Sequence, residues 1–136
     1  EPGKRPLSSM SPTIVSKDGK PVMVVGTPGG SRIITAVLQT MINAIDHGMT
    51  VQEAVDAPRF HQQWLPDVTN VETFAFSADT RKILVDMGHN LGVPQPANHL
   101  AAIIVGAPSL GGKPVANNRF YGANDPRRNT GLALGY

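Results

Sequence analysis

The chain has 136 residues, 40% of them hydrophobic and 16% charged, which fits one globular domain with its own core. Its formal net charge of +2 is dispersed and aromatic residues make up only 5%, so no nucleic-acid-binding surface is expected. Cysteine is absent, which excludes disulfides, thiolate metal sites and a cysteine nucleophile, and no apolar run approaches the ~18 residues of a membrane-spanning helix.

The N-terminal segment predicts an extended arm followed by a β-hairpin. Proline and glycine interrupt the first six residues, and the chain starts without an initiator methionine or an apolar leader, which indicates a piece of a longer protein. Residues 13–16 and 22–25 are strand candidates joined by a turn at Asp18 and Gly19. The second strand has four consecutive apolar residues, so we expect it to be covered on both faces.

A glycine-rich turn then leads into the longest predicted helix. Ser31 is expected to be its N-cap, helical periodicity begins at Arg32, and the helix ends at His47 and Gly48. Apolar side chains recur every four residues in two adjacent rows, so we expect a deeply packed helix. The rows are Ile33, Val37, Met41 and Ile45, and Ile34, Leu38 and Ile42.

The second half of the sequence predicts shorter elements. Thr50 and Glu53 form a capping box for a helix that ends before Pro58. Ser77 is expected to cap a further helix, closed by Gly88. The expected inner face of that helix is made of Ile83, Leu84 and Met87. The other expected segments are strands at 59–61, 68–73, 101–105 and 115–121, and an irregular, docked tail at 125–136.

The order of these elements, β-β-α-α-β-β-α-β-β, predicts the fold class. Adjacent strands are joined by short turns, and helices lie between the pairs of strands. We therefore expect an α+β fold with a mostly antiparallel sheet and helices packed on it.

Gly29 and Gly30 form the most informative local feature, because they lie between a buried strand and the start of a long helix. Two glycines let the backbone approach a ligand closely, and amides at a helix start suit an oxyanion or a carboxylate. A tight strand-to-helix turn without a ligand explains the same residues equally well. The segment has neither the Gly-Lys-Ser/Thr of a phosphate loop nor the G-x-G-x-x-G of a dinucleotide site.

The other polar candidates carry weaker signals. Ser8 and Ser9 on the extended arm can donate to a carboxylate, but a solvated loop is the more ordinary explanation, and no nucleophile motif surrounds them. Arg59 and Arg127 can bind anions, although ion pairs with the protein's own carboxylates are the commoner use. The four histidines have no metal-ligand spacing, so no metal site is expected. They are His47, His61, His89 and His99.

Four sequence blocks closely resemble the gamma-glutamyltranspeptidase family and follow that family's order. They are KRPLSSMSPTIV at residues 4–15, TPGGSRII at 27–34, APRFHQQWLP at 57–66 and YGANDPR at 121–127. Together they span nearly the whole chain. Residues 1–136 thus resemble the C-terminal portion of that family's small subunit, a single incomplete domain.

The resemblance implies an N-terminal-nucleophile hydrolase with an αββα sandwich, matured from one precursor by self-cleavage. In that family the new N-terminal threonine attacks the gamma-glutamyl carbonyl of glutathione or a related compound. Water or an amine acceptor then resolves the resulting ester, and no cofactor is expected.

The resemblance also implies roles for individual residues. Gly29 and Gly30 match the family's oxyanion hole, which agrees with the chemistry of their loop. Arg59 and Arg127 match positions expected to serve structure or maturation. The positions expected to contact the substrate and its alpha-carboxylate are Ser8, Ser9 and Met10.

The family's nucleophile has no counterpart in this sequence. Only three residues precede Lys4 and every threonine is internal, so none offers a free alpha-amine. We therefore expect the isolated chain to be inactive, with a large subunit and the missing N-terminal part of the small subunit as partners. The family also favours a periplasmic or secreted location. The alternatives are a related acylase, acting on cephalosporins or poly-gamma-glutamate, and a non-catalytic domain with the same fold.

Overall fold

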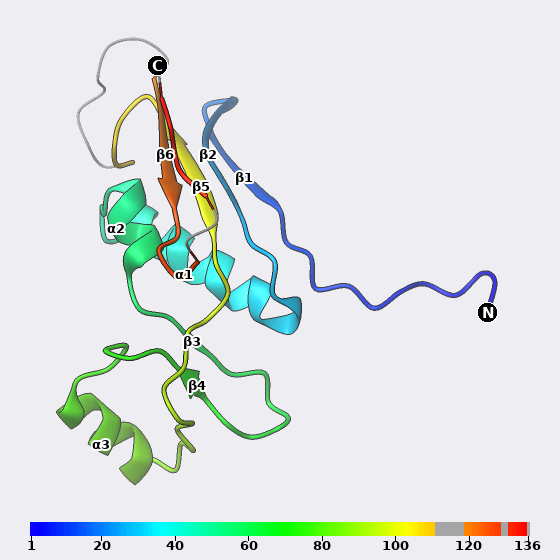
Figure 1. Ribbon diagram of the computed structural model, residues 1–136, viewed down its shortest axis with the longest axis vertical. Helices are drawn as coiled ribbons and strands as arrows, with labels where there is room; N and C mark the ends of the chain where they lie inside the picture. Colours follow the sequence, from blue (N-terminus) through cyan, green and yellow to red (C-terminus); the bar gives the residue numbers. More distant parts are fainter. Residues whose placement is uncertain (111–118, 129–130, 136) are drawn as a thin grey trace.

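The computed structural model describes residues 1–110, 119–128 and 131–135 (Figure 1). Within this part the elements follow in the order β1-β2-η1-α1-α2-β3-β4-α3-β5-β6. Apart from the short 3-10 helix η1, this is the predicted order. The expected α+β class is therefore confirmed.

A four-stranded antiparallel sheet in the order β1-β2-β5-β6 forms the centre of the molecule (Figure 1). Its strands are β1 (Thr13–Lys17), β2 (Lys20–Gly26), β5 (Ala101–Val105) and β6 (Phe120–Asn124). The predicted hairpin is confirmed, with Asp18 and Gly19 at φ angles of 51° and 75°. Strand β2 also pairs with β5, Met23 lying opposite Ile104, so a long excursion separates the two central strands.

Helices α1 (Ile33–Ile45) and α2 (Val51–Asp56) cover one face of this sheet. Alternate residues of β2 and β5 point toward them, because successive side chains of a strand face opposite ways. Burying each large apolar side chain contributes about 1.5–3 kcal/mol, so this interface is the main source of stability. The core is made of Met23, Val25, Ile33, Ala36, Val37, Ala44, Val51, Ala54, Val55, Leu100, Ala102, Ile104 and Ala123.

The opposite face of the sheet carries apolar side chains that the described residues leave open. Val24 and Ile103 are each 40% exposed, and Ile14 is 69% exposed. The expectation that the second strand is covered on both faces is therefore wrong for this chain. The physical reason is that the described residues contribute one sheet and one helical layer.

The start and the outer face of α1 differ from the prediction. Gly30–Arg32 form η1, and Arg32 takes the N-cap position of α1 without a side-chain capping bond. Ser31 instead donates its hydroxyl to Gln63. In the first apolar row Ile33 and Val37 are buried and Met41 is half-buried, but Ile45 is 45% exposed. The expected deep packing is therefore wrong at Ile45 and along the second row. That row is exposed at Ile34, Leu38 and Ile42.

The excursion between β2 and β5 contains the remaining elements. The predicted capping box of α2 is present. Strands β3 (Phe60–His61) and β4 (Asn70–Val71) form a two-stranded sheet and are shorter than expected. Helix α3 (Ala78–Asp86) is capped by Ser77 as predicted.

The expected inner face of α3 is wrong at two of its three positions. Ile83 and Met87 are 58% and 71% exposed, and only Leu84 is half-buried. In Figure 1, α3 lies at the end of the excursion, away from the main sheet, so the described residues offer little surface for it to pack against.

The C-terminal region agrees with the prediction in part. Strand β6 runs to Asn124, three residues beyond the expected strand at 115–121, and residues 115–118 lie outside the described part. The described residues of the tail are irregular, as expected. Docking is confirmed at Asp125, which is buried, and is wrong for residues 131–135, which are all exposed. Across the described ranges, no helix has the length and apolar character needed to cross a membrane.

Candidate functional site

The glycine loop, Gly29 and Gly30, follows β2 directly and opens η1. Gly29 has φ 141° and Gly30 has φ 60°, conformations that L side chains rarely adopt. Within the described residues, neither amide donates a hydrogen bond. A side chain at Gly30 would meet no atom within 4 Å. The loop therefore offers two backbone donors on an open surface.

Thr27 and Asn98 fix the side of the glycine loop that faces the protein. The Thr27 hydroxyl donates to the carbonyl of His99 and accepts from the Asn98 amide nitrogen, 3.2 Å away. Asn98 also packs against Gly29, where an added Cβ would lie 2.7 Å from the Asn98 Cβ. Gly29 is thus required by close packing as well as by its φ angle.

Ser31 fixes the downstream side of the loop. Its hydroxyl donates to Gln63 Oε1 at 2.6 Å, and the same oxygen lies 2.9 Å from His61 Nε2. The other ring nitrogen of His61 lies 2.8 Å from the Thr35 hydroxyl on α1. His61 is 7% exposed. Three side chains thus connect the loop to the body of α1.

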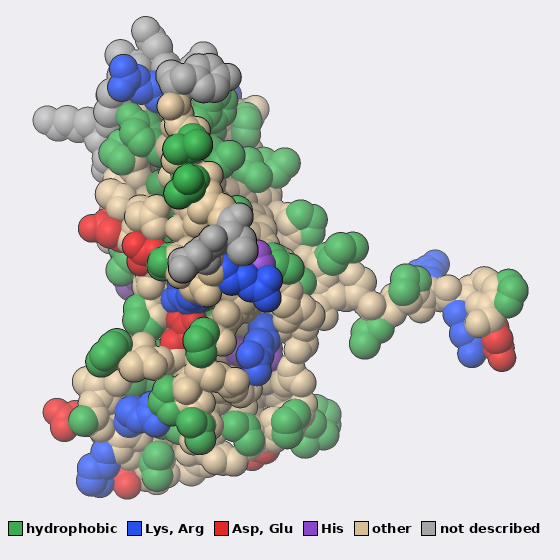
Figure 2. Space-filling view, in the orientation of Figure 1, with side chains coloured by type: hydrophobic (Ala, Val, Ile, Leu, Met, Phe, Trp, Pro, Cys, Tyr) green, Lys and Arg blue, Asp and Glu red, His purple; other side chains and the backbone are tan. Residues whose placement is uncertain are grey.

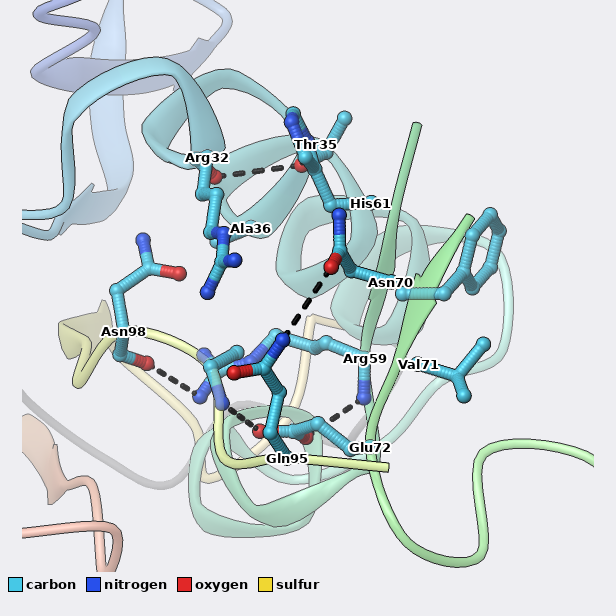
Figure 3. A pocket seen from close by; sticks show the side chains of 12 residues that line it. Arg32, Thr35, Ala36, Arg59, His61, Asn70, Val71, Glu72, Gln95 and Asn98 are labelled. Atoms are coloured by element: carbon cyan, nitrogen blue, oxygen red, sulfur yellow. Dashed lines mark hydrogen bonds between the residues drawn. The ribbon is translucent and has the colours of Figure 1, made fainter. Parts of the chain in front are cut away.

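A small cavity lies between the start of α1, the two-stranded sheet and Asn98 (Figure 3). Arg32 points into it toward Arg59 and Asn98. Within the described residues, Nε and Nη1 of Arg59 and Oδ1 of Asn98 have no hydrogen-bond partner. The cavity has about 20 Å³ of space, room for about one water molecule. It is too small for an organic substrate.

Arg59 and Arg127 meet in a buried cluster with two carboxylates. Nη2 of Arg59 donates to Asp125 at 2.6 Å and to the carbonyl of Asn98 at 2.9 Å. Arg127 pairs with Asp125 at 3.0 Å and with Glu72. The ion pairing with the protein's own carboxylates, favoured by residue chemistry, is thus confirmed.

The cluster ties together segments that are distant in the sequence. Glu72 accepts from the backbone amides of Arg59 and Ala97, at 2.8 and 2.7 Å. Nη1 of Arg127 donates to the carbonyl of Val55 at the C-terminal end of α2, where a cation is favourable. The cluster therefore fixes the ends of α2, β4 and β6 relative to one another.

Electrostatics keep the cluster ionised. Burial raises the pKa of Glu72, but hydrogen bonds from Arg127 and two backbone amides outweigh it and hold the pKa below its ordinary value. Burial likewise raises the pKa of Asp125, and Arg59 and Arg127 together lower it further than burial raises it. The pKa of Arg127 is raised by Glu72 and Asp125 against the opposing effect of burial.

The N-terminal arm leaves the sheet at the same end as the glycine loop, because Thr13 pairs with Val25. Figure 2 shows the arm projecting from the body of the molecule. Met10 is 77% exposed, and its amide donates locally to the Ser8 hydroxyl at 3.3 Å. Among the described residues, neither Ser8 nor Ser9 forms a hydrogen bond with the glycine loop.

Comparison with known proteins identifies the family to which the chain belongs. The sequence profile described as Gamma-glutamyltranspeptidase matches residues 1–135. This chain belongs to the gamma-glutamyltranspeptidase family. It is 77% identical to a glutathione hydrolase proenzyme of Pseudomonas sp. (strain A14) and 50% identical to one of Escherichia coli (strain K12). Each match covers 99% of this chain, which spans 24% and 22% of those relatives.

A solved structure supports the same placement. The chain is similar to a mutant gamma-glutamyltranspeptidase of Helicobacter pylori, with a TM-score of 0.81 and 51% identity over 94% of this chain and 66% of that one. The α+β fold with a mostly antiparallel sheet, expected from the sequence, is thus confirmed for this chain.

Sequence reasoning missed several residues of this site. Glu72 and Asn98 are single polar residues in segments that predict no motif, and only the fold brings them to Arg59 and Gly29. His61 lies within a family block, yet only its burial and its contact with Gln63 single it out. Within residues 1–110, 119–128 and 131–135, no group of three or more His, Cys, Asp or Glu is placed to hold a metal.

Proposed function

We propose that this gamma-glutamyltranspeptidase chain is the C-terminal part of a small subunit and contributes to the transfer or hydrolysis of gamma-glutamyl groups, with glutathione and related compounds as donors. The observation that carries the proposal is the pair of amides at Gly29 and Gly30, which have positive φ and no hydrogen-bond acceptor among the described residues, next to open space at Gly30. Relatives named glutathione hydrolase proenzyme support this donor class.

In the proposed reaction, a threonine hydroxyl outside this chain attacks the gamma-carbonyl carbon and loses its proton to a base. The carbonyl electron pair moves to oxygen, and the amides of Gly29 and Gly30 donate to that oxyanion. Each such donor is worth about 3 kcal/mol of transition-state stabilisation. The base then returns the proton to the amine nitrogen, the oxyanion re-forms the carbonyl, and the C–N bond breaks to release the amine. The gamma-glutamyl ester that remains is cleaved by water or an amine acceptor.

The N-terminal arm would supply the carboxylate contacts. Ser8 and Ser9 carry hydroxyl donors suited to the substrate's alpha-carboxylate, and Met10 would line the same pocket. The shared end of the sheet supports this assignment, because the arm needs only to fold back over the glycine loop. Arg59 and Arg127 would serve structure or maturation and would not touch substrate.

The remainder of the precursor would supply what this chain lacks. We expect a threonine shortly upstream, a large subunit, and surfaces that cover the open face of the sheet. The exposed side chains of Val24 and Ile103 support such a covering. A periplasmic or secreted location stays a prediction. Sequencing the parent gene tests the first point, because the absence of an upstream threonine would contradict the proposal.

A glycine substitution in the full-length protein tests the role of the loop. Gly30→Val places a branched side chain at φ 60° in the open space before the amides, and we expect kcat for glutathione to fall by about two orders of magnitude. Gly48→Val is the matched control, because Gly48 has φ 65° and equally open surroundings but lies beyond α1. Unchanged turnover in Gly30→Val would favour a non-catalytic domain.

Substrate assays separate the enzymatic alternatives. The full-length protein should turn over glutathione faster than a glutaryl-cephalosporin or poly-gamma-glutamate. A preference for either of the latter compounds would assign the chain to a related acylase.

A further inference from the structure

The glycine loop needs support from its neighbours. Glycine has more backbone freedom than any other residue, whereas oxyanion donors act by being held in place before the charge develops. On the upstream side, Thr27 and Asn98 provide this support. On the downstream side, the backbone amides of Arg32 and Ile33 donate to the carbonyls of Gly29 and Gly30. The side-chain contact there is the bond from Ser31 to Gln63.

The hydrogen-bond directions in the downstream support follow from its chemistry. The Gln63 amide nitrogen donates to the carbonyl of Leu65 at 3.0 Å, so Oε1 is the atom that faces Ser31 and His61. Because that oxygen only accepts, His61 must carry a proton on Nε2. The Thr35 hydroxyl lies 2.8 Å from Nδ1 and is also 3.2 Å from the carbonyl of Arg32, to which it can donate. The chain of bonds thus runs from Thr35 through His61 to Gln63.

His61 is well placed to fix Gln63. The residue is buried, and its ring contacts Thr35 on α1. The backbone of Phe60 is clamped to the same helix by Gln39, which accepts from the Phe60 amide at 3.1 Å and donates to its carbonyl at 2.8 Å. His61 therefore connects Gln63 to helix α1.

We propose that His61 and Gln63 are positioning residues for the glycine loop. They hold the Ser31 side chain and thereby fix the backbone that follows Gly30, although neither would touch substrate. This inference rests on the oxyanion role proposed for the loop. The exposed bond between Ser31 and Gln63 contributes little to folding, so its main consequence is the geometry of the loop.

Two substitutions at His61 in the full-length protein test the direction of the support. His61→Gln retains an N–H near the position of Nε2 and can still donate to Gln63, whereas His61→Asn places its amide near Nδ1 and reaches only Thr35. We expect His61→Asn to lower kcat for glutathione by roughly ten- to a hundred-fold with KM within about two-fold, as for a small misplacement of catalytic donors. His61→Gln should stay within about three-fold of wild type.

A second pair of variants keeps the test independent of folding at His61. Gln63→Leu removes the acceptor of Ser31 from an exposed position and should lower kcat as His61→Asn does. Gln62→Leu is the matched control, because the neighbouring Gln62 is also exposed but bonds to Trp64 and Asp67. The double variant His61→Asn/Gln63→Leu should lose little more than either single variant, because both changes break one connection.

The outcomes separate this inference from the proposed function. A wild-type kcat in Gln63→Leu would overturn the positioning role. So would an equal loss of kcat in His61→Gln and His61→Asn that follows the loss in their thermal midpoints. In either case Gly30→Val still tests the oxyanion hole. A wild-type enzyme that hydrolyses no gamma-glutamyl compound would overturn the proposed function and this inference with it.

Discussion

Asp125 shows at the scale of one residue how the chain is held together. Its carboxylate is 1% exposed and accepts from Arg59, from Arg127 and from the backbone amide of Leu100. A buried ion cluster adds little net stability compared with apolar packing, but the loss of one member leaves another charge buried without compensation. Removing Asp125 should therefore cost more stability than the intact cluster contributes.

Asp125→Asn in the full-length protein should lower the free energy of unfolding at pH 7 by about 3–5 kcal/mol, because Arg59 loses its only ion-pair partner among the described residues. The folded-state pKa of Asp125 is depressed, so its contribution is present above the unfolded pKa and is lost as the pH falls through the folded value. The difference between variant and wild type should therefore narrow below about pH 4. Urea unfolding across pH 3–7 measures both effects.

The exposed ion pair of α3 provides the comparison for this experiment. Lys82 and Asp86 are 74% and 61% exposed, and such pairs contribute little in water. Lys82→Ala should leave the free energy of unfolding almost unchanged at every pH. If Lys82→Ala lowered it as much as Asp125→Asn does, burial would not decide how much these ion pairs contribute.

At the scale of an element, α2 has a disproportionate role for six residues. It packs into the core through Val51, Ala54 and Val55, while Arg127 binds its C-terminal carbonyls. So short a helix is unstable by itself, because it forms too few hydrogen bonds to offset the free-energy cost of nucleation. Its N-terminal capping box and its contacts therefore decide whether it forms.

Thr50→Ala should lower the free energy of unfolding by about 1 kcal/mol, because the Glu53 amide loses its acceptor at the helix start. Thr50→Ser keeps a hydroxyl at the N-cap and should lose much less. Chemical denaturation of the full-length protein measures both. Equal losses in the two variants would indicate that the threonine methyl group, and not the cap, matters.

At the scale of the whole molecule, the described chain has one well-packed interface and two open apolar surfaces. The first is the outer row of α1, with Ile34 53% and Leu38 52% exposed, and the second is the far face of the sheet around Ile14 and Ile103. Exposed apolar side chains gathered on one face are typical of a protein interface. The rest of the precursor is the partner that we propose.

The isolated 136-residue chain should therefore bind the dye ANS strongly and associate in solution, whereas the full-length protein should bind little dye per molecule. Fluorescence titration and sedimentation compare the two proteins directly. A monomeric isolated chain with no dye binding would contradict the proposal that the remainder covers these surfaces.

The sequence by itself determined the local elements and the family. The Asp18–Gly19 turn, the capping box at Thr50 and the cap at Ser77 depend on residues within a few positions of one another, so local chemistry was enough to predict them. The family blocks likewise include Gly29 and Gly30, to which the resemblance assigns the oxyanion hole.

Only the tertiary structure decided which faces are buried and which polar groups meet. The apolar rows of α1 look alike in sequence, yet only one faces the sheet, because burial depends on which layers are present. Ser31 resembles an N-cap until folding places Gln63, 32 positions away, within reach of its hydroxyl. Asp125 and Arg59 are joined across 66 positions for the same reason: chain topology, and not sequence spacing, sets long-range proximity.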